Sequence, residues 1–378
     1  MRIIQKAILP LGFKANGVSA GLKKSGKLDL ALFYSEIPAK AACKFTMNKL
    51  QAAPLKVCKD YLRKSRVFQA IIVNSGNANC FTGKPGVLDA IQTTKYAADY
   101  LGIKKETVLV NSTGIIGKRL SVDKIKSAIP GLVQGLSIAG IEKGVKAIMT
   151  TDTFAKEITA KINIAGKVVT ICGTAKGAGM IAPNMATMLA FIFTDANITQ
   201  KALDKATRLA VNESFNCITV DGCMSTNDTL AVLANGACGN NLIDSGKNFD
   251  LFLDALKKAC LELAKMIIKD AEGATKFIEI KVEKAKSFAQ ARIAALAIAN
   301  SNLFKTALYG ENPNFGRIAA AVGASGIDVK EEDIKIKVSS LKKKQVFVKV
   351  GINRGKSSAI VYTSDLTPEY IKINAEYN

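Results

Sequence analysis

The sequence predicts an α+β fold in which layered sheets are flanked by helices. Hydrophobic residues make up 48% of the 378 residues, which is enough to bury a substantial core without disulfides or metals. Short β-type runs and amphipathic helical segments are mixed without strict β-α alternation, which disfavours a doubly wound parallel sheet. At roughly 100–200 residues per domain, a chain of this length is expected to form two lobes.

The first part of the chain alternates short strands with helical segments. Glycine and asparagine turns separate apolar runs at residues 28–34, 67–73 and 108–110, which we predict to be strands. Amphipathic periodicity predicts helices near residues 86–101 and 121–129.

A hairpin and then a longer helical region are predicted further along the chain. Residues 157–172 alternate apolar and polar side chains around Ala165-Gly166-Lys167, which is typical of a hairpin. The uncharged run at residues 180–193 ends in an apolar strand. The remaining pattern predicts helices at 199–215, 249–269 and 288–299, and strands at 277–282 and 346–350.

The composition excludes several kinds of active site. The chain has no His, which rules out Ser-His-Asp triads, Cys-His dyads and His-metal sites. None of the 8 Cys residues forms a CxxC pair, so we expect no metal site and no redox motif. Scattered Cys residues without a secretory segment predict a reduced, cytoplasmic protein. No run of 18 apolar residues occurs, so we expect no membrane span.

The charge balance is strongly basic. Lys and Arg number 53 against 31 Asp and Glu, a net charge of +22, and such a balance invites nucleic acid or anionic ligands. The charge is spread along the chain, however, and the densest run, Lys342-Lys343-Lys344, lacks interleaved aromatic residues. We therefore expect a solvated basic surface without a nucleic-acid site; a basic nucleic-acid-binding protein is the non-enzyme alternative.

The segment CGTAKGAGMIAPNMATMLAFIF, residues 172–193, differs from its surroundings. Its glycines allow close backbone approach, and the Thr187 hydroxyl at the head of a buried strand would be held rigidly in a dry setting. It is not a phosphate-binding loop, because Lys176 precedes Gly177 rather than following it. An ordinary strand preceded by a glycine turn explains this composition equally well.

The segment VLVNSTGIIGKRL, residues 108–120, places Thr113 and Gly114 directly after a short apolar run. Such a turn can aim a hydroxyl and a bare backbone N–H at one point, as an oxyanion hole requires. Ordinary turn chemistry is the alternative.

Further polar clusters occur at residues 73–83, 150–153 and 219–229. Because buried polar groups need partners, each cluster is either a hydrogen-bonded loop scaffold or a set of ligand contacts. In DAEGATK, Glu272 precedes Gly273 at the end of a predicted helix. Glu272 is therefore either a solvated residue before a glycine cap or a carboxylate placed for an ammonium ligand.

In this order the segments resemble those of the glutamate N-acetyltransferase/ornithine acetyltransferase family, which consists of self-cleaving enzymes of arginine biosynthesis. The resemblance runs nearly end to end. The motifs that carry it are PLGFKANGVSAGLK, NSGNANCFTG, NSTGIIG, TTDTFAK, KGAGMIAPNMATMLAFI, VDGCMSTNDT, DAEGATK, KTALYGENPNFGRI and KINAEYN.

The resemblance implies self-cleavage between Ala186 and Thr187. The products would be an alpha chain, 1–186, and a beta chain, 187–378, packed as one two-lobed body with a self-processing, N-terminal-nucleophile-like acetyltransferase fold. The freed Thr187 amine would serve as the base that His supplies elsewhere, since an α-amine has an ordinary pKa of about 8. Thr187 would take an acetyl group from N-acetylornithine and pass it to glutamate, giving ornithine and N-acetylglutamate.

Family site residues carry over onto matching positions of this sequence. Thr113 and Gly114 match the oxyanion pair beside the nucleophile Thr187. The substrate contacts match Thr150, Lys176, Thr187, Glu272 and Asn374. We assign a substrate carboxylate to Lys176 and an ammonium to Glu272.

The resemblance also implies partners and assembly. We expect acetyl-CoA to serve as a second acetyl donor, no other cofactor, and a heterotetramer of two alpha and two beta chains. Three positions depart from the family pattern: the family usually has one more residue, a Thr, after Asn378, an Asp where Cys223 stands, and a Trp where Phe315 stands. The Cys223 departure is expected to remove a charge near the core.

A related enzyme class is the alternative within this fold. Self-processing N-terminal-nucleophile aminopeptidases and amidases share the cleavage logic, but they typically expose a Ser nucleophile, which Thr187 does not match.

Overall fold

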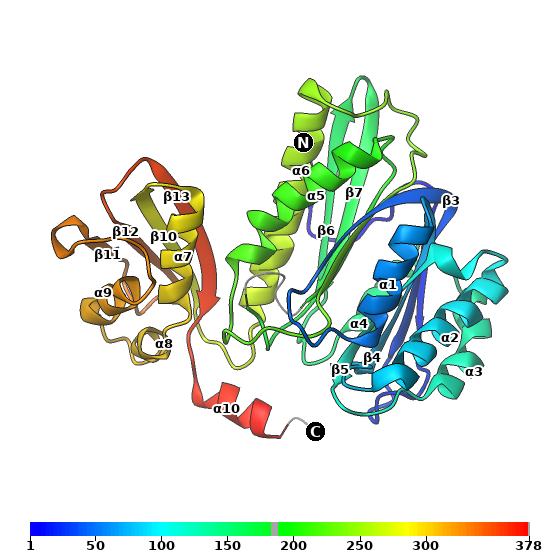
Figure 1. The fold of residues 1–378 in the computed structure, drawn as a ribbon, viewed down its shortest axis with the longest axis horizontal. Coiled ribbons are helices and arrows are strands. Elements are labelled where there is room, and N and C mark those ends of the chain that lie inside the picture. The colour runs from blue at the N-terminus through cyan, green and yellow to red at the C-terminus, as the bar shows by residue number, and fades with distance from the viewer. Residues whose placement is uncertain (183–187, 377–378) are drawn as a thin grey trace. The chain divides into compact units, whose positions relative to one another are not determined.

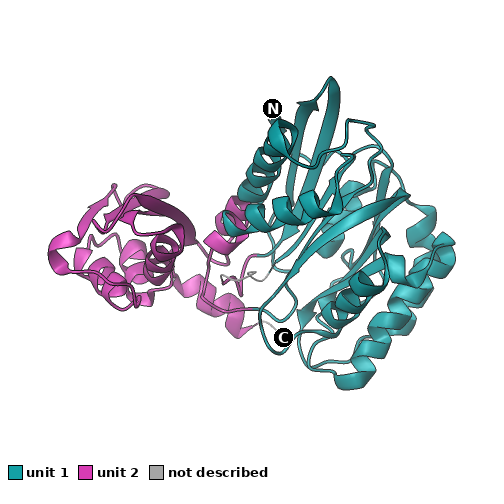
Figure 2. Cartoon of the chain, turned by 45° about the horizontal axis from the view of Figure 1, so that its top comes forward, with its two compact units in different colours: residues 1–177, 187–213, 225–263 teal, residues 178–186, 214–224, 264–378 magenta. Residues whose placement is uncertain are grey.

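The computed structural model describes residues 1–182 and 188–376. Its contacts divide the chain into two compact units, coloured teal and magenta in Figure 2. Unit 1 comprises residues 1–177, 187–213 and 225–263, and unit 2 comprises residues 178–186, 214–224 and 264–378. Each unit has its own sheet and its own helices, so the predicted α+β class with layered sheets is confirmed (Figure 1).

In the described part of unit 1, one sheet is built from nine strands. They follow the order β1-β6-β7-β8-β9-β3-β4-β5, and β2 pairs with β3 off this path. The pairs β4–β5 and β8–β9 are parallel and the other pairs are antiparallel. The strands are β1 (Arg2–Ile4), β2 (Phe13–Val18), β3 (Leu30–Phe45), β4 (Phe68–Asn77), β5 (Val108–Ile115), β6 (Lys156–Ile164), β7 (Lys167–Lys176), β8 (Leu189–Thr194) and β9 (Thr229–Ala234).

The predicted strands of the first part are confirmed, but all three continue beyond their predicted ends, and β3 continues the furthest. The apolar alternation that predicts residues 28–34 stops at Glu36 and Pro38, whereas β3 continues to Phe45. Its first half pairs with β4, and a register shift between Tyr34 and Ala39 precedes its pairing with β9. The irregularity explains why alternation alone ends the strand too early.

The predicted hairpin is confirmed as β6 and β7. Ala165 and Gly166 connect the strands with φ of +48° and +85°. Positive φ at both central residues is the geometry of a type I′ turn, which matches the twist of antiparallel strands.

Five helices lie entirely within the described part of unit 1. They are α1 (Ala53–Lys64), α2 (Gly83–Leu101), α3 (Val122–Gln134), α4 (Ile141–Ile148) and α5 (Gln200–Asn212). Helices α1 and α2 both contact β5, and α3 packs against α2 (Figure 1). Rings of Phe33 and Phe191, 5.6 Å apart, and of Phe13 and Phe193, 5.4 Å apart, join β2, β3 and β8 in the core.

In the described part of unit 2, four strands form a sheet in the order β11-β12-β10-β13. The apolar face of this sheet packs against α7, and the predicted strands at 277–282 and 346–350 and the helix at 288–299 are confirmed. The elements are β10 (Phe277–Ala285), α7 (Phe288–Ala299), α8 (Asn302–Tyr309), α9 (Phe315–Gly323), β11 (Lys335–Val338), β12 (Gln345–Gly351), β13 (Ser357–Ser364) and α10 (Pro368–Ala375).

One long helix crosses the boundary between the units. Helix α6 (Gly246–Lys269) belongs to unit 1 up to Leu263 and to unit 2 from Ala264. No helix in the described ranges is both long and apolar enough to cross a membrane.

Candidate active site

The predicted oxyanion residues lie at the end of β5. Thr113 is buried, and Gly114 is aligned with Gly76 on the parallel strand β4. Gly114 has a φ of +130°, and a Cβ at this position would lie 2.4 Å from the carbonyl carbon of Gly76. Only glycine therefore fits, and the close approach of the two strands leaves a backbone N–H without a flanking side chain.

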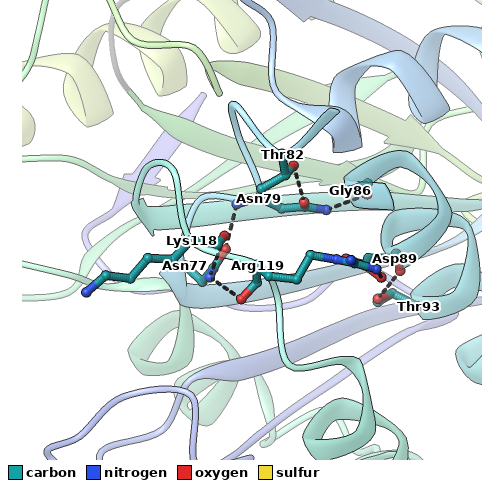
Figure 3. Close-up of polar contacts among 8 residues, drawn as sticks. All are labelled: Asn77, Asn79, Thr82, Gly86, Asp89, Thr93, Lys118 and Arg119. Atoms are coloured by element: carbon teal, nitrogen blue, oxygen red, sulfur yellow. Dashed lines mark hydrogen bonds and ion pairs between the residues drawn. The ribbon is translucent and has the colours of Figure 1, made fainter. Parts of the chain in front are cut away.

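A hydrogen-bonded scaffold fixes the loops on either side of this strand end. The Asn77 amide donates to the carbonyls of Lys118 and Arg119, at 3.2 Å each, and its oxygen accepts from the Asn79 N–H at 2.7 Å. Thr82 donates to the Asn79 side chain at 2.9 Å, and the Asn79 amide donates to a carbonyl of α2. Figure 3 shows this network, in which the cluster at residues 73–83 acts as a loop scaffold.

Lys176, at the end of β7, is brought to the oxyanion residues. Its Nζ donates to the Thr113 hydroxyl oxygen at 3.0 Å, and the lysine is 5% exposed. An ammonium that donates to a hydroxyl oxygen polarises the O–H bond, so the Thr113 hydroxyl becomes a stronger hydrogen-bond donor.

A buried carboxylate, Asp152, ties a third segment to this group. Asp152 accepts from Lys156 Nζ at 2.7 Å and from the N–H groups of Gly177 at 2.7 Å and Thr150 at 2.9 Å. Burial acts to raise the pKa of Asp152, but the ammonium groups of Lys176 and Lys156 outweigh it and lower that pKa to about 2. Asp152 is therefore an anion that holds the predicted substrate residue Thr150 beside Lys176.

Sequence reasoning missed the role of Asp152. The cluster at residues 150–153 indicated buried polar groups, and Lys156 four residues later was a further signal. Neither signal identified the carboxylate as the group that joins Thr150 and Gly177.

The predicted cleavage site Ala186–Thr187 lies outside the described residues. The first described residue after it, Met188, is held by the polar cluster at residues 219–229: its N–H donates to Asp228 at 3.1 Å, and its carbonyl accepts from Thr229. Burial raises the pKa of Asp228 well above its ordinary value. Asp228 therefore fixes the head of β8 through its hydrogen bond to Met188.

In unit 2, two further predicted residues meet. The Glu272 carboxylate accepts from the Asn374 amide, on α10, at 2.9 Å. The same carboxylate lies against Gly179, where an added Cβ would be 2.1 Å from Glu272 Oε2. Glu272 is half-buried, and its partner Asn374 is exposed. Both interpretations of DAEGATK therefore remain open.

The glycine after Glu272 has a different role from the predicted cap. Helix α6 ends at Lys269, so Gly273 is not its cap residue. A Cβ on Gly273 would lie 2.5 Å from the N–H nitrogen of Tyr370, and Thr367 donates to its carbonyl at 2.7 Å. Close packing against α10 is the reason for a glycine here.

Asp221 lies in the polar cluster at residues 219–229, and the sequence did not predict its role. Its carboxylate accepts from the N–H groups of Met180 at 2.6 Å and Ile181 at 3.0 Å, and from the Tyr370 hydroxyl at 3.0 Å. It therefore ties the segment before the predicted cleavage site to α10. Cys223, next to this aspartate, is exposed, so the expectation that it removes a charge near the core is wrong.

The described side chains form two groups. Unit 1 brings Thr113, Gly114, Lys176 and Thr150 together around Asp152, and unit 2 brings Glu272 and Asn374 together. Among the described residues, no group of three or more Cys, Asp or Glu side chains is placed to hold a metal ion. In unit 1 the Thr113 hydroxyl and the Gly114 backbone lie beside the buried ammonium of Lys176.

Comparison with known proteins decides the family. The model of the ArgJ family matches residues 14–378. The chain belongs to the ArgJ family. It is 46% identical to the arginine biosynthesis bifunctional protein ArgJ of Geobacter sulfurreducens, over 97% of this chain and 98% of that protein. It is also 46% identical to the protein of the same name from Caldanaerobacter subterraneus, over 98% of both.

A solved structure resembles part of the chain. The crystal structure of ornithine acetyltransferase from Mycobacterium tuberculosis complexed with ornithine is 37% identical, covers 48% of this chain and 97% of that chain, and has a TM-score of 0.45. Family membership makes this ArgJ chain an acetyltransferase of arginine biosynthesis, as predicted.

Proposed function

We propose that this ArgJ protein cleaves itself before Thr187 and then transfers acetyl from N-acetylornithine to glutamate through an acetyl-Thr187 ester. One observation supports the proposal most: the Lys176 ammonium donates to the Thr113 hydroxyl beside Gly114, in a chain whose family performs arginine biosynthesis. The arrangement suits a reaction in which negative charge develops on a carbonyl oxygen.

Self-cleavage would begin with attack of Thr187 Oγ on the Ala186 carbonyl carbon. A C–O bond forms, the C–N bond breaks, and the proton of the hydroxyl ends on the new amine; water then hydrolyses the ester. The products are the chains 1–186 and 187–378. The Thr187 α-amine, with an ordinary pKa of about 8, replaces the missing imidazole as base.

In the transfer cycle, Thr187 Oγ first accepts the acetyl group and then releases it. Thr187 Oγ attacks the acetyl carbonyl of N-acetylornithine, the amide C–N bond breaks, and ornithine leaves as a protonated amine. The α-amine of glutamate then attacks the ester and releases Oγ, which recovers its proton. Thr113 and Gly114 stabilise the oxyanion in both steps, Lys176 holds a substrate carboxylate, and Thr150, Glu272 and Asn374 complete the substrate contacts, with Glu272 facing an ammonium.

Acetyl-CoA is proposed as a second donor, since it delivers the same acetyl group to the same hydroxyl. The protein would work without another cofactor, in the cytoplasm, as a heterotetramer of two alpha and two beta chains.

The test is a transfer assay with N-acetylornithine carrying an isotopic label in its acetyl group. The proposal predicts labelled N-acetylglutamate, no transfer by the Thr187→Ala variant, and ornithine release that depends on the amount of glutamate. Equal release of ornithine with water as the sole acceptor would contradict acetyl transfer and would point to the amidase alternative. With acetyl-CoA as donor, formation of N-acetylglutamate tests the second activity.

A further inference from the structure

Lys23 lies in the loop between β2 and β3, and the proposed mechanism does not use it. Its Nζ donates to the carbonyl of Leu28 at 2.8 Å and to the carbonyl of Met149 at 2.7 Å. Met149 directly precedes Thr150, so the lysine is bound to the segment that carries a proposed substrate contact.

The stem of Lys23 lies against the end of β4, the strand that pairs with β5 and its oxyanion residues. A Cβ on Gly76 would lie 3.1 Å from Lys23 Cγ, and Gly76 is the residue aligned with Gly114. Lys23 is therefore fixed at two points: beside the end of the β4–β5 pair and at the start of the segment that Asp152 organises.

The charges around Lys23 leave an excess of positive charge. Lys23, Lys27, Lys156 and Lys176 share this region with two carboxylates, Asp152 and Asp29. Asp152 is paired with Lys156, and Asp29 accepts from the N–H groups of three residues of the loop, Ala20, Leu22 and Lys23. An additional anion would reduce this excess.

The titration of Lys23 reflects the same surroundings. Burial lowers its pKa to about 8; Lys176 and Lys27 also act to lower that pKa, and Asp29 and Asp152 act to raise it. An ammonium in this setting gains from an anionic partner, because the partner offsets both the desolvation and the repulsion.

An ammonium has three N–H donors, and the described residues accept from two of those of Lys23. We propose that Lys23 donates its third N–H to the side-chain carboxylate of the acceptor glutamate and so determines acceptor specificity. The proposal rests on the proposed acetyl transfer. Lys176 is bonded to Thr113, at the reacting carbonyl, and so is the nearer cation for the α-carboxylate; Lys23, held by Leu28 and Met149, remains for the second carboxylate.

The proposal separates the two substrates by charge. Glutamate has a side-chain carboxylate, whereas N-acetylornithine has an ammonium at the end of its side chain. Lys23 would attract the first and repel the second, so its removal should affect the acceptor half-reaction and not the donor half-reaction. Glutamine, which keeps the shape of glutamate without its charge, isolates the contact.

The experiment compares Lys23→Met with Lys24→Met, an exposed neighbour with the same loss of charge. For each protein, kcat/KM is measured with glutamate and with glutamine as acceptor, and ornithine release is measured in the first turnover. We expect Lys23→Met to lower the glutamate-to-glutamine ratio by roughly 10- to 100-fold, as for a lost hydrogen bond between charged groups. First-turnover ornithine release should change by less than about 3-fold, and Lys24→Met should match the wild type.

An equal loss with both acceptors would overturn the proposal, because it would mean that Lys23 only supports the segment of Met149. Lys23→Arg keeps a charge at all accessible pH values and provides a second test that does not depend on the methionine variant folding. In the wild type the glutamate-to-glutamine ratio of kcat/KM should fall as the pH rises through about 8, because Lys23 loses its charge. In Lys23→Arg the ratio should not change with pH. Identical pH profiles of the two proteins would contradict the proposal. A wild type that releases no ornithine would instead refute the acetyl transfer itself.

Discussion

Gly114 shows how a single residue limits the site. Its φ is +130°, and a Cβ added here would lie 2.4 Å from the carbonyl carbon of Gly76. The position therefore has no room for a methyl group. We predict that Gly114→Ala lowers kcat by about 100-fold or more, the effect of disturbing one oxyanion donor. Steady-state kinetics measure it.

The matched control is Gly131→Ala in α3, where an added Cβ meets no atom within 4 Å. That variant should keep wild-type kcat, and its melting temperature should be no lower than that of the wild type, because alanine favours a helix interior more than glycine does. Wild-type activity in Gly114→Ala would show that this backbone position is not part of the catalytic site.

Asp152 gives a prediction about pH and stability. Its pKa is about 2 in the folded protein against an ordinary value of 3.8, so its ionisation stabilises the fold above about pH 4, and this stabilisation is lost as the pH falls toward 2. The difference corresponds to about 2 kcal/mol. We predict that Asp152→Asn is less stable than the wild type at pH 6 by at least this amount, because Lys156 loses its buried partner.

Urea unfolding at pH 6 and pH 3 measures the effect. The difference in free energy of unfolding between the wild type and Asp152→Asn should be smaller at pH 3 than at pH 6. An equal difference in unfolding free energy at both pH values would contradict the claim that ionised Asp152 stabilises the fold.

The residues of the site were only partly predictable from the sequence. Thr113 and Gly114 follow from a turn after an apolar run together with the family resemblance. The contact of Lys176 with Thr113 joins residues 63 positions apart, so it depends on how β7 and β5 are placed in the sheet. Asp152 and Asp221 serve backbone N–H groups, and no spacing rule identifies such partners in advance.

At the scale of elements, β7 packs closely against β8 and α6 at Gly173. A Cβ on Gly173 would lie 2.6 Å from Ile192 Cδ1 on β8 and 2.9 Å from Leu263 Cδ1 on α6. We predict that Gly173→Ala destabilises the protein by about 1–3 kcal/mol through overpacking. Chemical denaturation measures it.

The control is Gly351→Ala on β12, where the built Cβ meets its nearest atom, on Lys335, at 4.0 Å. Gly351→Ala should destabilise the protein less than Gly173→Ala does. The reverse order of stability would contradict the packing described for β7.

Element prediction succeeded where the apolar pattern was regular. The hairpin of β6 and β7 and helices α5, α6 and α7 follow alternation or helical periodicity over many residues. Strand β1 has three residues, which is too short to show a period, and it forms because β6 offers it a partner. Helix α4 does carry apolar residues at helical spacing, Ile141, Val145 and Ile148, and the sequence analysis did not predict it.

At the scale of the whole molecule, the sheet of unit 1 joins the two predicted chains. Strands β8 and β9 would belong to the chain 187–378, yet β8 pairs with β7 and β9 pairs with β3. Both strands are fully buried and lie inside the strand order. We predict that the cleaved chains co-elute in native size-exclusion chromatography and separate only in denaturant.

The control for this prediction is to mix the native protein with an isotope-labelled preparation of the same protein. Because the two chains share one sheet, labelled and unlabelled chains should not exchange between molecules before unfolding. Free exchange of chains under native conditions would contradict the interlocked sheet.

The central claim is that Thr187 is freed by cleavage and carries the acetyl group. The most direct measurement is the intact mass of the wild type and Thr187→Ala, each before and after brief exposure to N-acetylornithine. The account predicts two chains, 1–186 and 187–378, with one acetyl group added to the second chain and removed by glutamate, and an uncleaved, unacetylated variant. A cleaved Thr187→Ala chain, or an acetyl group on the chain 1–186, would contradict it.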